Sequence, residues 1–233
     1  MPHVTNPGLG GGQLPVLFKR TSVSSAQLQN LLGAPVLLVG APGAGKLLVF
    51  FGALMAYKFG TVAYDAPGDV LEVIYGSNIN PQLTPNASVT GLIASAASAA
   101  AFASASYASI FGILPGSDNT ALNLYGQDYN VGPIATTSLG AGGLGYAVND
   151  TGVLTDGDGT AAYKVLTVGA GGAVLTYQIT NTGHLYPVEN GAATATGGAQ
   201  PGVGTGLTIN ILTIVQGDGT LTVTTYYQVV AVP

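Results

Sequence analysis

The sequence predicts a mostly β protein, organised as an antiparallel β-sandwich or barrel-like module with short helices. The chain of 233 residues contains 36 glycines, and apolar runs of strand length lie between turns rich in Gly, Pro and Asn. Only 6% of the residues are charged. Because solubility normally depends on a charged surface of mixed sign, this low share indicates that much of the surface is covered in an assembly.

The composition also excludes several classes of function. The chain has no cysteine, which rules out disulfides and thiolate metal sites. Its basic side chains are too few to follow a phosphate backbone, so we expect no nucleic-acid partner. Residues 92–114 are uncharged and long enough to span a bilayer, but five serines interrupt them and no basic residue anchors either end. We therefore expect no membrane partner, and a short Ala-rich helix or a Ser/Ala connection over these residues.

The first elements along the chain follow from their boundary residues. Residues 1–20 begin with MPHVTNPGLGGG, which lacks the features of a secretion signal and indicates a flexible N-terminal arm. Ser24 or Ser25 is the expected N-cap of a short helix that ends at Gly33. Strands are predicted for the apolar runs that follow, at residues 36–39, 47–56, 61–64 and 70–75.

After Tyr129, Gly, Thr and Asn become frequent and the predicted strands alternate apolar with polar residues. This change predicts a second, glycine-rich β module. Residues 163–168 and 174–180 flank the turn segment Gly169-Ala170-Gly171-Gly172, a pattern typical of a β-hairpin. A further strand is expected at 207–215. The last strand, at 219–230, needs a sheet to join, and periodicity leaves open whether that sheet belongs to the first or the second module.

The stretch GAPGAGK, from Gly40 to Lys46, matches the glycine-rich phosphate loop G-x-x-x-x-G-K. A working loop of this kind opens a helix and continues with Ser or Thr, whereas here Leu47 follows and begins a run that suits a buried strand. Pro42 also removes one backbone N–H donor. The prediction is therefore a tight turn between two strands, with no nucleotide cofactor and no enzymatic activity.

The acidic motif at Asp156 and Asp158, with Asp150 upstream, offers alternating carboxylates of the kind that bind Ca²⁺. No glutamate follows at the required distance, and the same Gly-Asp-Gly-Thr recurs at 217–220. A recurrent turn is therefore the interpretation of both copies, with calcium left open.

Few other residues offer chemistry. His184 alone could support a Ser-His-Asp relay, and a lone loop histidine is expected to be solvated. Turns or exposed faces are expected for six carboxylates: Asp65, Asp69, Glu72, Asp118, Asp128 and Glu189. Core or subunit-contact positions are expected for three tyrosines: Tyr57, Tyr64 and Tyr75.

The order of motifs resembles small structural proteins of tailed-bacteriophage virions, of the capsid decoration (cement) or head-fibre kind. The motifs are APGAGK, GTVAYD, LEVIYG, an Ala/Ser-rich passage, NTALNLYG and GDGTLTVTTYYQVV, with GDGTAAYKVLTV and GAGGAVLTYQITNTGHLY between the last two. The resemblance implies that the last strand returns to the first module. The arm (1–20) would then precede a main β module (21–130 plus 214–233) carrying an inserted Gly-rich β lobe (131–213).

This resemblance and the composition lead to an expected function. The chain would be a non-enzymatic virion protein on the outer capsid surface, binding the major capsid protein and itself, as a homotrimer. The arm would make the capsid contact through Val16, Leu17, Phe18, Lys19 and Arg20. Three alternatives are a fibre or receptor-binding adhesin whose lobe meets a host glycan or cell surface, a tail tube or baseplate component, and a P-loop NTPase.

Overall fold

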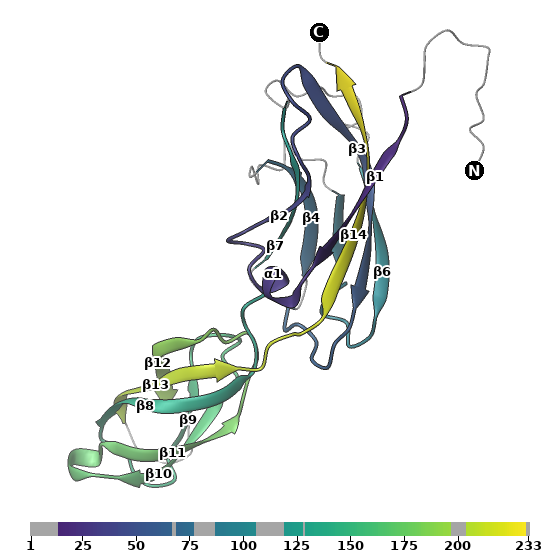
Figure 1. Cartoon of the computed structure of the whole chain (residues 1–233). Helices are drawn as coiled ribbons and strands as arrows, with labels where there is room; N and C mark the ends of the chain where they lie inside the picture. The colour runs from purple at the N-terminus through teal and green to yellow at the C-terminus, as the bar shows by residue number, and fades with distance from the viewer. Residues whose placement is uncertain are drawn as a thin grey trace.

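The computed structural model describes residues 14–66, 69–76, 87–105, 119–127, 129–196 and 204–231. The predicted fold class is confirmed, since 57% of the structure is strand and 4% is helix, with antiparallel sheets of which one is nearly closed like a barrel. Figure 1 shows two modules joined end to end, a sandwich and a lobe, with the start of the strand Leu17–Val23 and the end of the strand Thr220–Ala231 at the end of the sandwich away from the lobe.

The sandwich consists of two four-stranded antiparallel sheets packed face to face. One sheet has the order β1 (Leu17–Val23), β14 (Thr220–Ala231), β3 (Lys46–Lys58) and β6 (Ala99–Ser104). The other has the order β2 (Val36–Val39), β7 (Leu122–Gly126), β4 (Val70–Tyr75) and β5 (Ala87–Thr90). Alternate residues point inward on either side of a register shift between Phe50 and Gly52 of β3, so that Phe50 and Met55 of β3 and Leu71 of β4 are completely buried in one shared core.

The last strand belongs to the first module. β14 lies between β1 and β3 and pairs with β3 along its whole length, from Thr220 opposite Lys58 to Ala231 opposite Lys46. The chain therefore leaves the sandwich after β7, forms the whole lobe, and returns in β14. The lobe is thus an insertion between two strands of the sandwich.

The short helix α1 (Ser25–Gln29) begins where the sequence predicts it. Ser24 is the N-cap, because its hydroxyl accepts a hydrogen bond from the Gln27 N–H while the Gln27 side chain accepts one from the Ser24 N–H. The helix stops at Asn30, before the predicted end at Gly33. Leu28 is completely buried and fixes α1 against the sandwich core.

The lobe is a six-stranded antiparallel sheet that curls until its two edge strands meet. Its order is β11 (Val174–Asn181), β10 (Ala162–Val168), β9 (Thr151–Leu154), β12 (Glu189–Thr196), β13 (Thr205–Ile214) and β8 (Ile134–Leu144). The Tyr177 hydroxyl of β11 donates to Thr137 Oγ1 of β8 at 2.8 Å. Gly142 permits the approach, since a Cβ there would lie 2.6 Å from the carbonyl oxygen of Val174.

The predicted hairpin of the lobe is confirmed. β10 and β11 pair as antiparallel neighbours around the single turn η1 (Ala170–Gly172). Gly171 and Gly172 have φ values of 69° and 74°, which side-chain-bearing residues rarely adopt. Inside the barrel, Tyr163 and Tyr186 are completely buried and form the centre of a second core.

Two predicted elements are wrong. Residues 61–64 form a loop, because the N–H groups of Thr61 and Val62 donate to the Asp218 carboxylate instead of to a neighbouring strand. The second is the Ala-rich helix or Ser/Ala connection expected within 92–114. Over the described part of this segment the chain forms no helix, and β6 pairs with β3 as an edge strand. Residues 106–114 lie outside the described residues. No helix in the described part of the chain is long and apolar enough to cross a membrane.

The boundary predicted for the N-terminal arm also needs correction. Residues 1–13 lie outside the described residues, but Leu17–Val23 is a regular strand paired with β14. Residues 17–20, assigned to the arm from the sequence, therefore belong to a sheet, because β14 leaves an edge to which they bond.

Candidate functional site

The five residues predicted to make the partner contact lie at one edge of the sandwich. β1 pairs with β14 on one side, and no strand pairs with its other side among the residues that the structure describes. The side chains of Val16 and Phe18 are 57% and 71% exposed, and those of Leu17, Lys19 and Arg20 are exposed as well. The structure therefore brings these residues together as an exposed edge strand.

An apolar row, consisting of Phe18, Leu54, Phe102 and Tyr226, extends from this edge across the outer face of the sheet. Phe18 lies opposite Tyr226, whose ring centroid is 6.3 Å from that of Phe102. Phe102 in turn lies opposite Leu54. Because these residues come from all four strands of the sheet, the row is continuous from one edge to the other.

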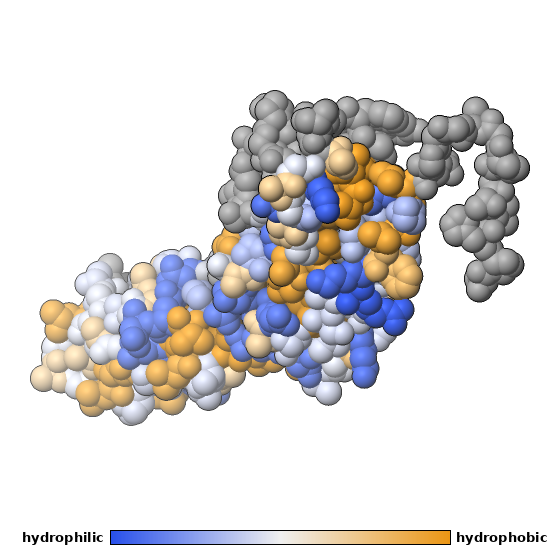
Figure 2. Space-filling view, turned by 45° about the horizontal axis from the view of Figure 1, so that its top comes forward, coloured by the Kyte–Doolittle hydropathy of each residue, from blue (hydrophilic) through white to orange (hydrophobic). Residues whose placement is uncertain are grey.

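Gly52 makes room for the row. A Cβ at Gly52 would lie 2.5 Å from Cζ of Phe102, so only glycine allows that ring to lie over β3. Phe102 is 57% exposed and Leu54 is 38% exposed. Figure 2 shows hydrophobic residues gathered on part of the sandwich surface.

Three residues of the row were not predicted from the sequence: Leu54, Phe102 and Tyr226. The signal that could have found Tyr226 is the alternation in β14, where Leu221, Val223 and Thr225 point inward. Phe102 could not be found in this way, because its segment was not read as a strand.

One basic residue borders the apolar row. Arg20 lies two residues after Phe18 in the same strand and therefore on the same face, whereas Lys19 points to the opposite face. Charged residues on an edge strand discourage pairing with another strand edge. The surface is therefore suited to face-on packing against an apolar patch bordered by carboxylates.

The glycine-rich loop at Lys46 connects β2 to β3, as predicted. Gly43 and Gly45 have φ values of 99° and 69°, and Lys46 begins a strand instead of a helix. The Gly43 N–H donates to Oδ1 of Asn119 at 2.9 Å, and the Lys46 N–H donates to the Gly43 carbonyl at 3.2 Å. Two N–H groups that a phosphate loop would present to its ligand are thus bonded within the protein.

The two Gly-Asp-Gly-Thr motifs make different contacts. Asp158 accepts hydrogen bonds from its own turn, from the Thr160 N–H at 3.0 Å and the Thr160 hydroxyl at 2.7 Å. This copy is the turn that the sequence predicts. No group of three or more His, Cys, Asp or Glu side chains in the described residues could hold a metal ion, so nothing in the geometry supports calcium at Asp156 and Asp158.

The interpretation of the second copy as a self-contained turn is wrong. Asp218 accepts hydrogen bonds from the Thr61 N–H and hydroxyl, both at 2.7 Å, and from the Val62 N–H at 2.9 Å. The backbone hydrogen bond from Val62 and those from Thr61 lower the pKa of the Asp218 carboxyl. Asp218 therefore fastens the strand that returns from the lobe to a loop of the sandwich.

A second contact joins the two modules at His184. Oδ2 of Asp65 accepts a hydrogen bond from the Leu185 N–H at 2.7 Å and lies 3.3 Å from Nδ1 of His184. The His184 side chain is 64% exposed but paired, and the Asp65 side chain is only 15% exposed. His184 is exposed to solvent, as expected from the sequence, but it also contacts Asp65. Asp65 was expected in a turn or on an exposed face, and instead it makes a contact between the modules.

Asp69 departs most from its expected exposure. It is completely buried; its Oδ2 accepts a hydrogen bond from the Ile93 N–H at 3.1 Å, and its Oδ1 has no partner among the described residues. Burial raises the pKa of this carboxyl. The residues around Asp69 are typical of a turn, so the local sequence does not indicate a buried position.

The expected core position is confirmed for Tyr57 and Tyr64, each 2% exposed. Tyr75 is half-buried and has a structural task. Its hydroxyl donates to the Leu48 carbonyl at 2.7 Å and accepts from the Phe50 N–H at 3.3 Å, which satisfies the edge of β3 where β6 does not reach. Burial raises the pKa of Tyr75 to about 12.

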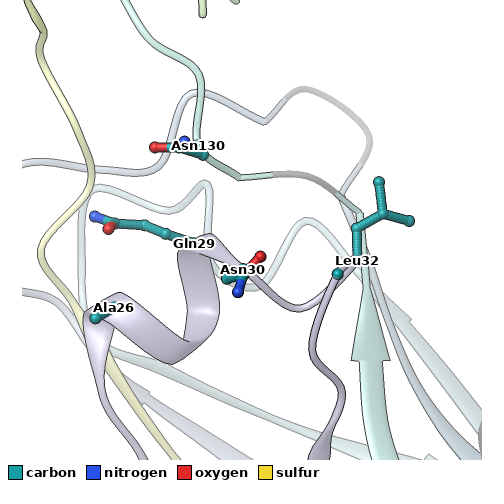
Figure 3. Close-up of a pocket in the computed structure, with 6 residues that line it drawn as sticks. Ala26, Gln29, Asn30, Leu32 and Asn130 are labelled. Atoms are coloured by element: carbon teal, nitrogen blue, oxygen red, sulfur yellow. The ribbon is translucent and has the colours of Figure 1, made fainter. Parts of the chain in front are cut away.

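A depression of about 380 Å³ lies where α1 meets the chain leaving the sandwich (Figure 3). Its lining residues are Ala26, Gln29, Asn30, Leu32, Gly33 and Asn130. Gln29 donates to the Gly217 carbonyl at 3.0 Å, and Asn130 accepts a hydrogen bond from Gln216. Two of its amides thus bind the returning chain, and none of the six lining residues is ionisable, so the depression belongs to the joint between the modules.

A scan of protein-family models, a search of curated proteins and a search of solved structures each find no match to this chain.

Proposed function

We propose that this chain is a non-enzymatic structural protein of a phage virion, which binds the outer capsid surface as a homotrimer. The resemblance of its motifs to capsid decoration and head-fibre proteins suggests this class. The observation that carries the proposal is the exposed Phe18 on an edge strand, continuous with the apolar row of Phe18, Leu54, Phe102 and Tyr226.

Such a surface favours binding to another protein. Exposed aromatic side chains gain free energy when a partner removes them from water, and aromatic residues are enriched at the centres of interfaces. A protein that binds only the assembled capsid stabilises it by mass action. The major capsid protein is the proposed partner of the β1 edge and of the row beside it.

The test is cosedimentation with capsids assembled from the major capsid protein of the same virus. Deleting residues 2–20 would be a poor test, because residues 17–20 pair with β14 and their loss would damage the sheet. The variant Phe18→Ser leaves the backbone pairing intact and removes the most exposed side chain of the row. We expect its affinity to fall about 30-fold, the effect of a typical interface anchor.

Leu37→Ser is the matched control, because Leu37 is 51% exposed but lies in β2 of the other sheet. Its binding should equal that of the unaltered chain. Unchanged binding by Phe18→Ser would refute the proposed contact.

Imaging of the native particle distinguishes a capsid protein from a fibre, since density of this chain at the tail tip would support the fibre or adhesin alternative. Mass photometry of the free chain should give the mass of three chains.

A further inference from the structure

The joint between the sandwich and the lobe is crossed by two short segments of chain. One runs from β7 to β8 on the way out, and the other runs from β13 to β14 on the way back (Figure 1). Modules of one chain usually move relative to each other unless their interface holds them, and glycine-rich connections usually favour such motion. The contacts of this joint indicate the opposite.

The two connecting segments are packed against each other. The Val215 N–H donates to the Pro133 carbonyl at 2.8 Å, and the Gln216 side chain donates to Asn130. A Cβ at Gly132 would overlap the carbonyl oxygen of Val215, and Gly132 has no positive φ, so close approach of the two segments is what requires glycine. The segments therefore form one ribbon, in which neither can swing alone.

The returning segment is also packed into the sandwich. A Cβ at Gly217 would lie 2.5 Å from Cγ of Tyr64, which is itself buried. The Gly217 carbonyl accepts a hydrogen bond from Gln29 at 3.0 Å, and the Gly219 carbonyl accepts one from the Tyr64 hydroxyl at 2.8 Å. Asp218, between these glycines, binds the neighbouring loop of the sandwich. These contacts leave the returning segment little freedom to act as a hinge.

A strained residue of the lobe makes a further contact with the sandwich. Leu185 has a φ of 62°, a conformation that side-chain-bearing residues rarely adopt. In this conformation its N–H donates to Oδ2 of Asp65 at 2.7 Å. We call this hydrogen bond the latch. Backbone strain persists only where the surrounding structure enforces it, and it is often found where a geometry serves function.

Both ends of the latch are anchored in their own modules. On the lobe side, Tyr186 is completely buried and exchanges two backbone hydrogen bonds with Gly132, at 3.0 and 3.1 Å. On the sandwich side, Asp65 lies between the buried Tyr64 and the buried Ala66, whose carbonyl accepts from the Asp69 N–H at 3.1 Å. Turning the lobe would therefore break the latch or displace a core residue.

We propose that the sandwich and the lobe form one rigid body, in which the latch and the packed returning segment hold the lobe at a fixed angle. The turn between β10 and β11, at the outer end of the lobe, then points in a direction set by the surface that the sandwich binds. The lobe acts as a stiff spacer. This proposal goes beyond the capsid contact and does not depend on it, because it concerns contacts within one chain.

The absence of cysteine allows a direct test with spin labels on introduced cysteines. Leu37→Cys with Leu175→Cys places one label on each module, at side chains that are 51% and 57% exposed. Leu175→Cys with Leu212→Cys places both labels on the lobe and serves as the reference for motion of the labels themselves. In pulsed electron paramagnetic resonance, we expect the pair across the joint to give one peak of distances, as narrow as that of the reference pair. A broad distribution across the joint would refute the rigid body.

Variants at Asp65 test the latch in the same labelled chain. Asp65→Ala removes the acceptor and should abolish the narrow peak, whereas Asp65→Asn keeps an oxygen that can accept the Leu185 N–H and should retain it. His184→Ala is the matched control, because it leaves the latch intact. Thermal unfolding checks that each variant is folded; if Asp65→Ala is not, the unaltered chain and Asp65→Asn still decide. A narrow peak in folded Asp65→Ala, or its loss in Asp65→Asn, would overturn the latch.

Discussion

The two Gly-Asp-Gly-Thr segments, at 157–160 and 217–220, have the same sequence and different contacts. Asp158 binds Thr160 within its own turn, whereas Asp218 binds Thr61 and Val62, far away in the sequence. Both precede strands. The difference shows that the motif determines a turn-forming tendency, while the surroundings decide which hydrogen bonds its carboxylate makes.

The glycines of the two segments are also needed for different reasons. In the lobe, Gly159 has a φ of 70° and nothing within 4 Å of its Cβ position, so backbone conformation selects glycine. Next to the sandwich, the Cβ position of Gly219 lies 2.3 Å from the hydroxyl of Tyr57, so lack of space selects it. Gly159 therefore lies at an open position of its turn, and Gly219 lies in a packed seam.

The largest effect expected from this comparison is that of Gly219→Ala. The added methyl group must displace the buried Tyr57 ring, and overpacking of this kind costs about 3 kcal/mol of unfolding free energy. Gly159→Ala should cost about 1 kcal/mol, the strain of a left-handed backbone. Thermal and urea unfolding of both variants would measure the difference, and equal losses would contradict a packed seam at Gly219.

Asp218→Ala should have the next largest effect. It removes three hydrogen bonds to another segment, whereas Asp158→Ala removes bonds within one turn and serves as the control. Hydrogen exchange should accelerate at the amides of Thr61 and Val62 in Asp218→Ala only. Because hydrogen bonds lower the folded pKa of Asp218, its stabilising effect is present above the unfolded pKa and is lost as the pH falls through the folded pKa.

Asp69 should show the opposite dependence on pH. Burial raises its folded pKa, so the favourable contribution of its protonated form is complete below the unfolded pKa and is lost as the pH rises through the folded pKa. Asp69→Asn imitates the protonated carboxyl and should raise the melting temperature at pH 7. It should also reduce the slope of the melting temperature with pH above the usual carboxyl pKa of about 3.9. An unchanged slope would show that Asp69 does not titrate in this way.

His184→Ala should have the smallest effect. The side chain is 64% exposed, and exposed ion pairs contribute about 0–1 kcal/mol. The hydrogen bond from the Leu185 N–H to Asp65 remains. The unfolding free energy should change by less than about 0.5 kcal/mol, and a larger loss would mean that the joint depends on the imidazole itself.

The sequence could predict much of the fold because local patterns dominate in it. The bounds of β2 and β4, the Ser24 cap and the hairpin of β10 and β11 follow from boundary residues, from alternation and from turn glycines. The sequence-based prediction of secondary structure failed at 61–64 and at 99–104, where contacts with distant residues decide the conformation. An Ala/Ser segment has little preference of its own, and β3 gives residues 99–104 a strand to join.

The candidate site was only partly predictable, for the same reason. Exposed apolar residues after a glycine-rich start indicated a contact at residues 16–20. The residues beside Phe18 come from β14, β3 and β6, so that only strand order and register unite them. Leu54 and Phe102 carry no motif, and no local pattern marks them.

The sequence by itself determined the β class, most of the strands, and the turn at Lys46, because alternation, proline and glycine act over a few residues. Only the tertiary structure decided where β14 pairs, how the edges of the lobe meet, and what Asp65, Asp69 and Asp218 contact. These outcomes depend on hydrogen bonds and packing between residues far apart in the chain, whose geometry exists only after both modules have formed.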